Sequence, residues 1–244
     1  MSKRILAVFA HPDDEAFGPA GTLARYADEG VEIHLLCATR GEAGQNNIKY
    51  HPPAGGSNIG NIRERELLKS AKILGLKKVE FLDYIDGMLC NALYHQIADK
   101  IMKKIKSFKP QIIITYERRG VSGHLDHIAI SMITTYSYLH TSVANKLYYH
   151  CLSDNLRKSE GRLDDYFVYF PEGYDEKDIT TKIDYSIFWD RKVGAMKAHE
   201  SQIEDVEFIL SRHKKRPKID NFILQFHRGV KVELSEGDLF AGIS

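Results

Sequence analysis

The sequence is poor in the features that mark several large classes of protein. Its 244 residues include three cysteines, none in a C-x-x-C pair, so we expect no disulfide framework and a reducing compartment fits. No apolar run approaches the ~18 residues that a transmembrane helix needs. The formal net charge is +1, which gives no electrostatic reason to expect nucleic acid or a membrane as a partner.

We also expect no targeting signal at the start of the chain. Its first apolar run ends at His11, too early for the apolar core of a signal peptide, so we expect a cytoplasmic protein. With 43% hydrophobic residues, a chain of this length suits one domain. We therefore predict a single domain over residues 1–244, with a core at about 1–152 and a C-terminal elaboration at about 153–244. The sequence leaves a homo-oligomer open.

The first part of the chain alternates strand-like and helix-like patterns. The segment from Ile5 to Ala10 is apolar throughout, which suits a strand buried on both faces. Strands alternating with helices indicate a mostly parallel sheet with helices on both faces. We predict an α/β, Rossmann-like three-layer sandwich with strand order 3-2-1-4-5. The predicted strands are 5–10, 31–39, 79–82, 111–116 and 146–152, and the predicted helices are 18–30, 61–74, 93–108 and 126–140.

Two segments do not follow this alternation of strands and helices. Residues 40–60 are rich in Gly, Asn and Pro and indicate a long loop, a feature that is often functional in a compact domain. Beyond residue 153 the periodicity weakens; we predict strands at 166–170 and 222–227 and a helix at 186–200. The acidic and aromatic stretch 164–190 suggests an insertion or a flap on the substrate side.

Two polar clusters follow buried strands. The first is His11-Pro12-Asp13-Asp14-Glu15, in which four of five side chains are able to bind a metal or move a proton. Taken alone it also suits a turn that caps a helix, with Asp13 or Asp14 as the cap. The second cluster, residues 122–127, contains His124, Asp126 and His127, and taken alone it also suits a polar loop with Asp126 as a helix cap.

The two clusters together are more informative than either alone. Strands one and four are neighbours in the predicted order, and the winding reverses between them, which opens a ligand-binding crevice at their carboxyl ends. Both clusters lie at those ends. Two imidazoles and a carboxylate with an open position form a typical catalytic zinc site. A dinucleotide site is disfavoured because no G-x-G-x-x-G follows the first strand.

The motifs resemble those of the LmbE-like (PIG-L) metal-dependent N-deacetylases, which include GlcNAc-phosphatidylinositol, GlcNAc-malate and mycothiol-pathway deacetylases. The resemblance rests on residues 10–15 (AHPDDE), Gly21-Thr22-Leu23, Gly60-x-x-Arg63-x-x-Glu66 and His124-x-Asp126-His127. It covers about residues 4–150, with a later echo at residues 197–202 (KAHESQ).

The resemblance implies a role for each matching residue. It implies one divalent metal ion, with Zn²⁺ expected, held by His11, Asp14 and His127. Asp13 matches the general base, and His124 matches an imidazole that stabilises the oxyanion or protonates the leaving amine. The remaining matches are Asp126, which would orient an imidazole, Arg63, which would contact the substrate, and Glu15, as support beside the ligands.

Two departures from the family pattern stand out. Leu125 replaces a proline between the histidine and the aspartate, for which we expect a backbone adjustment. Ser122 stands where some members have a tyrosine, so Tyr116 or a later tyrosine would have to supply that phenol.

We therefore expect a hydrolase that removes an N-acetyl group from an N-acetylglucosamine-containing or related small molecule. Two alternatives stay open: an amidase on other amides such as thiol conjugates, and a non-catalytic metal- or sugar-binding module. The donor set also suits Fe²⁺.

Overall fold

The computed structural model describes residues 2–44, 59–159, 171–214, 216–232 and 236–243. Most of the predicted loop 40–60 and the predicted strand 166–170 lie outside these ranges. Among the described residues, no helix combines the length and the apolar character needed to cross a bilayer.

A seven-stranded sheet forms the centre of the molecule, in the order β3-β2-β1-β4-β5-β7-β6. The first five strands are parallel, whereas β7 is antiparallel to both β5 and β6. The predicted order 3-2-1-4-5 is therefore confirmed, and two further strands extend the sheet beyond β5. The strands are β1 (Arg4–Phe9), β2 (Glu32–Cys37), β3 (Lys78–Phe81), β4 (Ile112–Tyr116), β5 (Lys146–Cys151), β6 (Thr181–Asp184) and β7 (Ile219–His227).

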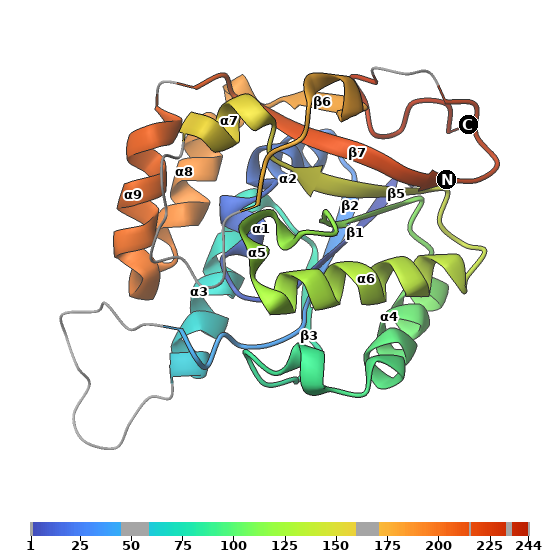
Figure 1. Ribbon diagram of the computed structural model, residues 1–244, viewed down its shortest axis with the longest axis horizontal. Coiled ribbons are helices and arrows are strands. Elements are labelled where there is room, and N and C mark those ends of the chain that lie inside the picture. The colour runs from blue at the N-terminus through green and yellow to red at the C-terminus, as the bar shows by residue number, and fades with distance from the viewer. Residues whose placement is uncertain (1, 45–58, 160–170, 215, 233–235, 244) are drawn as a thin grey trace.

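Helices cover both faces of the sheet, as Figure 1 shows. The α-helices are α1 (Asp14–Phe17), α2 (Ala20–Asp28), α3 (Ile59–Leu74), α4 (Tyr94–Phe108), α5 (Gly120–Gly123), α6 (Leu125–Leu139), α7 (Asp154–Ser159), α8 (Trp189–Lys197) and α9 (Ile203–His213). Short 3₁₀ turns are η1 (Leu89–Asn91), η2 (Glu176–Asp178), η3 (Ser186–Phe188) and η4 (Glu200–Gln202).

The alternation of side chains along β1 builds two cores. Ile5, Ala7 and Phe9 pack with α2, α3 and α8, while Leu6 and Val8 pack with α4 and α6. This is why every position of the strand is apolar. The three layers, helices–sheet–helices, are those of the predicted sandwich.

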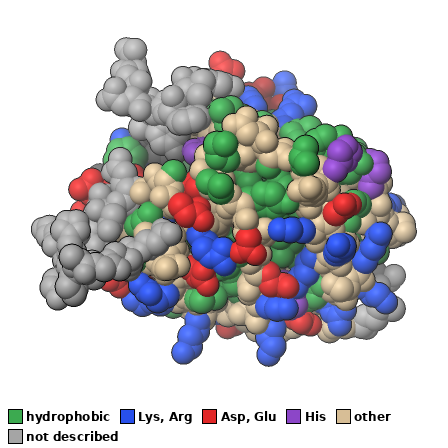
Figure 2. Space-filling model, turned by 90° about the horizontal axis from the view of Figure 1, so that it is seen from below, with side chains coloured by type: hydrophobic (Ala, Val, Ile, Leu, Met, Phe, Trp, Pro, Cys, Tyr) green, Lys and Arg blue, Asp and Glu red, His purple; other side chains and the backbone are tan. Residues whose placement is uncertain are grey.

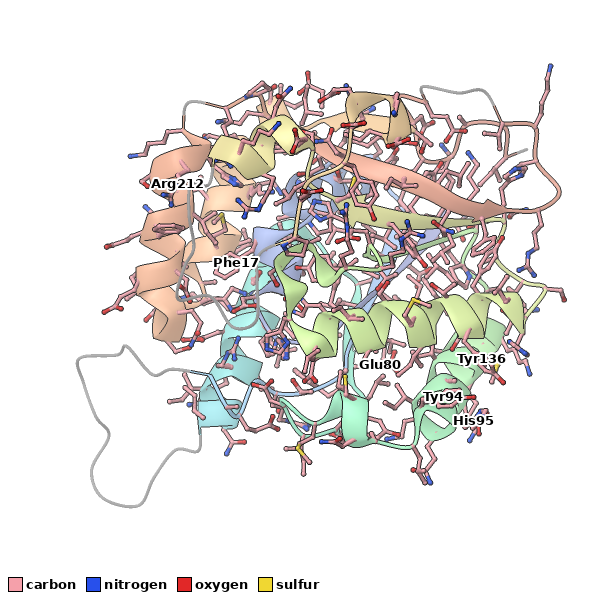
Figure 3. The ribbon with its side chains drawn as sticks, viewed as in Figure 1. Phe17, Glu80, Tyr94, His95, Tyr136 and Arg212 are labelled. Atoms are coloured by element: carbon pink, nitrogen blue, oxygen red, sulfur yellow. The ribbon has the colours of Figure 1, made fainter. Side chains whose placement is uncertain are left out.

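The surface carries no strong charge of one sign on the face drawn in Figure 2, where basic and acidic side chains intermingle. On the outer side of α4 and α6, Tyr94, His95 and Tyr136 form an aromatic cluster, which Figure 3 labels. This cluster belongs to the helices rather than to the carboxyl ends of β1 and β4.

Candidate active site

The turn after β1 positions the carboxylate of Asp14. Its Oδ2 atom accepts the backbone N–H groups of Ala10 and His11 at 3.0 and 2.9 Å. The hydroxyl of Tyr116, at the end of β4, donates to the backbone oxygen of Asp14 at 3.0 Å. Asp14 is buried, and although burial alone would raise its pKa, the nearby His127 holds the pKa below its usual range. The side chain is thus an anion fixed by its own turn.

The structure brings the three predicted metal ligands together across 116 positions of sequence. His127, in the first turn of α6, places Nε2 3.1 Å from Asp14 Oδ1 and 3.1 Å from His11 Nδ1. His11 Nδ1 lies 3.8 Å from Asp14 Oδ2. A tetrahedral zinc ion with bonds of about 2.1 Å separates its ligand atoms by roughly 3.4 Å, close to the 3.1 Å that separates His127 Nε2 from His11 Nδ1 and from Asp14 Oδ1.

In both His11 and His127, one ring nitrogen already makes a hydrogen bond to the protein. The other nitrogen of each ring is therefore the one that could bind a cation. His127 Nδ1 donates to the Gly120 carbonyl at 3.0 Å, and His11 Nε2 donates to Asp86 Oδ1 at 2.8 Å. In the neutral rings, the two remaining nitrogens therefore present lone pairs to each other and to Asp14. Three lone-pair donors at this spacing suit a divalent cation, and such outward hydrogen bonds are typical of metal-binding histidines.

Gly120 allows this arrangement through its backbone. It has a φ of +71°, and a Cβ on it would lie 2.8 Å from His127 Cβ. A larger residue at position 120 would therefore displace the ring of His127.

His124 completes a cluster of three imidazoles. One ring nitrogen from each of His11, His124 and His127 lies within 4.8 Å of the others. The Nδ1 atom of His124 accepts the backbone N–H of Asp126 at 3.1 Å, so in the neutral ring the proton resides on Nε2. Burial and the neighbouring His127 and His11 lower the pKa of His124 to about 4. The Nε2–H of His124 can then donate a hydrogen bond, as stabilisation of an oxyanion requires.

Two carboxylates hold the outer side of His11. Asp126 accepts the backbone N–H groups of Gly87 and Leu89 at 2.7 and 3.1 Å, and its Oδ2 lies 3.4 Å from His11 Nε2. Burial alone would lower the pKa of His11, but hydrogen bonds to Asp126 and Asp86 raise it to about 10, so a metal ion that binds here would displace the proton from Nδ1. These contacts place Asp126 where the sequence led us to expect an imidazole-orienting residue.

Asp86 was not among the site residues predicted from the sequence. It follows β3, which is two strands away from β1, yet the segment folds back so that its carboxylate reaches His11. The signal was present as an acidic residue beside Gly87 just after a strand of the parallel sheet.

Asp13 points away from its neighbour Asp14, toward Arg63 on α3. Arg63 donates to Asp13 Oδ2 at 2.8 Å and also to the carbonyls of Pro12 and Gly41 at 2.6 and 3.0 Å. Burial raises the pKa of Asp13 to about 6, although the charge of Arg63 opposes the rise. Asp13 is thus poised to exchange a proton near neutrality. Arg63 lies in the site as predicted, but its terminal nitrogens contact protein groups.

The third acidic residue of the motif, Glu15, is completely buried. Its Oε1 accepts from Ser70 at 2.5 Å and from His199 Nε2 at 2.8 Å, and its Oε2 accepts the backbone N–H of Asp13 at 3.1 Å. Glu15 therefore lies beside the site as expected. Among the described residues, Glu15 bonds to Asp13, Ser70 and His199 rather than to a histidine predicted to bind the metal.

The model of the family PIG-L, described as GlcNAc-PI de-N-acetylase, matches residues 6–137 of this chain. This range includes every site residue named above except His199. The chain belongs to the PIG-L family. A deacetylase of 1D-myo-inositol 2-acetamido-2-deoxy-α-D-glucopyranoside from Actinosynnema mirum is 30% identical and aligns over 98% of this chain and 97% of its own length. A mycothiol S-conjugate amidase from Streptomyces coelicolor is also 30% identical, over 98% of this chain and 97% of its own.

Solved structures share the fold of this PIG-L protein. The N,N′-diacetylchitobiose deacetylase of Pyrococcus horikoshii has a TM-score of 0.65 at 21% identity, covering 92% of this chain and 84% of that one. GalB, the 4-carboxy-2-hydroxymuconate hydratase of Pseudomonas putida, has a TM-score of 0.68 at 16% identity, covering 95% and 99%. One of these neighbours is a deacetylase and the other a hydratase, so the shared fold does not by itself determine the reaction.

The PIG-L phenol position is occupied differently here. Ser122 lies 3.3 Å from His127 Nδ1, beside the Gly120 carbonyl that this nitrogen contacts. Tyr116 is buried, its ring packs 4.8 Å from that of His127, and its hydroxyl is bonded to the Asp14 carbonyl. Tyr174, from the later region, donates to Glu117 at 2.7 Å. Tyr116 therefore packs against His127 and bonds to Asp14, two of the predicted metal ligands.

Proposed function

We propose that this protein is a metal-dependent hydrolase that removes the N-acetyl group from an N-acetylglucosamine-containing or related small molecule. The observation that carries the proposal is the meeting of His11, Asp14 and His127 around one point, with a separate carboxylate, Asp13, beside it. The PIG-L relatives, named as deacetylases of a GlcNAc-inositol compound, supply the substrate class.

The residues divide the chemistry of amide hydrolysis among them. A divalent ion held by His11, Asp14 and His127 would supply a water of lowered pKa and would polarise the amide carbonyl. Asp13 takes a proton from the attacking water. Its raised pKa suits it to this role, and its contact with Arg63 holds the carboxylate in place.

The Nε2–H of His124 donates a hydrogen bond to the oxygen of the tetrahedral intermediate. The proton gained by Asp13 is then available for the leaving amine. This assigns the proton transfer to Asp13 and the charge stabilisation to the Nε2–H of His124.

Zinc is the ion that we propose, because two imidazoles and one carboxylate with an open position are a common catalytic zinc site. Ferrous iron suits the same donors, so elemental analysis of the purified protein is needed to decide. We further propose a small N-acetylated sugar conjugate as the partner and the cytoplasm as the compartment.

A second candidate function is amidase activity on a thiol conjugate, which the relative from Streptomyces coelicolor favours. A panel assay separates the two. Metal content is measured first, and release of acetate from glucosaminyl conjugates is then compared with cleavage of bulkier amides. Acetate release supports the deacetylase, cleavage of bulkier amides alone supports the amidase, and a metal-loaded protein inactive on the whole panel would indicate a binding module.

A further inference from the structure

We infer that His199 is a positioning residue for Asp13, and that it acts through the buried carboxylate of Glu15. The inference rests on the proposed function, because it concerns the group assigned there as the general base. It gives the C-terminal elaboration a part in the site: His199 follows α8, whereas the other site residues come from the first 127 positions.

Asp13 has a backbone conformation that needs support. Its φ is +107° and its ψ is −25°, in a region that residues other than glycine rarely adopt. This conformation sends the side chain of Asp13 toward Arg63 while Asp14 faces His127. Relaxation of the turn would move the carboxylate of Asp13 relative to the reacting water.

Glu15 holds this turn by accepting the Asp13 N–H at Oε2. The carboxylate is completely buried, so it needs hydrogen-bond donors to stay in place. Among the described residues, Ser70 from α3 and His199 donate to it besides Asp13, and both donate to Oε1. His199 is itself completely buried, so its ring has little freedom to move.

His199 is fixed in turn by its neighbours. Its ring lies 6.5 Å from that of Phe17 at the end of α1, a residue labelled in Figure 3. Two residues later, Ser201 donates through both N and Oγ to Glu66 on α3, at 2.7 and 2.6 Å. The segment after α8 is thus fastened to α3 at one point and reaches Glu15 at another.

The test compares three variants in the metal-loaded enzyme. His199→Leu removes the donor to Glu15, His199→Gln retains an N–H donor at a comparable reach, and Glu200→Gln is the control on the next residue, because the exposed side chain of Glu200 is bonded to Lys69. We expect His199→Leu to lower kcat by about 10- to 100-fold with KM and metal content unchanged, since a displacement of about 1 Å has an effect of this size. His199→Gln should recover most of the loss, and Glu200→Gln should keep kcat near the wild-type value.

A second readout needs neither metal nor substrate. Hydrogen exchange of the Asp13 amide in the metal-free protein should be slow in the wild type and at least about tenfold faster in His199→Leu. If His199→Leu does not fold, Ser70→Ala, which removes the other donor to Oε1, is measured in the same two ways.

The inference is overturned if a folded His199→Leu keeps both kcat and slow exchange at Asp13, or if Gln rescues neither. Loss of metal from His199→Leu would also overturn it, because it would place the effect on the ligands. An equal loss in Glu200→Gln would also overturn it, because the loss would then not depend on the donor to Glu15. If the wild type releases no acetate from any conjugate, the proposed function fails, while the exchange experiment still decides the contact between Glu15 and Asp13.

Discussion

Removing the charge of Arg63 should shift the pH dependence of the enzyme toward alkaline pH. Arg63 contacts Asp13 at 2.8 Å, and both side chains are largely buried, so solvent screens the interaction weakly. An opposite charge at this distance lowers the pKa of a carboxyl by about 1–3 units. With Arg63→Met, the pKa of Asp13 should rise from about 6 toward roughly 8.

The size of the effect follows from the ionised fraction of Asp13. A base with a pKa of about 6 is ~90% ionised at pH 7, whereas one with a pKa of about 8 is only ~10% ionised. We therefore expect kcat/KM of Arg63→Met to fall about tenfold at pH 7 and to recover above about pH 9, with the acid limb of the profile displaced upward.

The assay is the pH profile of kcat/KM for acetate release, with Arg40→Met as the matched control. Arg40 is bonded to Glu64 and Asp83 rather than to Asp13, so its loss should leave the acid limb in place. Thermal melting checks that Arg63→Met is folded, because Arg63 also contacts two carbonyls. An acid limb at the wild-type position in a folded Arg63→Met would show that Asp13 is not the titrating base.

Three further predictions concern Asp13, His127 and His150. Asp13→Ala should retain the metal and lower kcat by about 10²–10⁴-fold; full activity would refute the base assignment. His127→Ala should lose metal and activity together, and unchanged metal content by elemental analysis would refute its role as a ligand. Burial lowers the pKa of His150 to about 4, so the unfolded chain binds a proton that the folded protein excludes. The contribution of His150 to the free energy of unfolding is therefore fully present above about pH 6.5 and is lost as pH falls toward 4, by about 2 kcal/mol at pH 5. Urea unfolding at pH 7 and pH 5 should show a loss that is smaller by this amount in His150→Asn; equal losses would contradict it.

The parallel part of the sheet could be predicted because each strand is apolar at nearly every position. Ile5 to Phe9 and Ile112 to Ile114 pack on helices from both sides, which leaves an uninterrupted hydrophobic signal. The end of the sheet beyond β5 carries no such signal. Along β6 the burial alternates, with Thr181 and Ile183 buried and Lys182 exposed, so only two of its four residues report the core. The antiparallel pairing of β7 with β5 depends on tertiary packing.

The same contrast applies to the site. His11, Asp14 and His127 could be predicted to converge because each follows a strand of known place in the sheet. The contact between Glu15 and His199 spans 184 positions and joins two side chains with no periodic pattern to mark them. Asp86 reaches His11 through an irregular segment whose path depends on backbone conformation. Residues placed by strands are predictable from sequence, and residues placed by loops and packing are not.

The pair Asp13–Asp14 shows how one short motif supplies two different carboxylates. The positive φ of Asp13 turns adjacent side chains to opposite partners, Arg63 on one side and His127 on the other. Burial then raises the pKa of Asp13 to about 6, while His127 and the backbone N–H groups keep Asp14 ionised despite burial. A permanently ionised carboxylate suits a metal ligand, and one that titrates near neutrality suits a general base. The division depends on the backbone of Asp13, so in the mechanism proposed here the contacts that hold this turn, including that of Glu15, matter as much as the predicted ligands do.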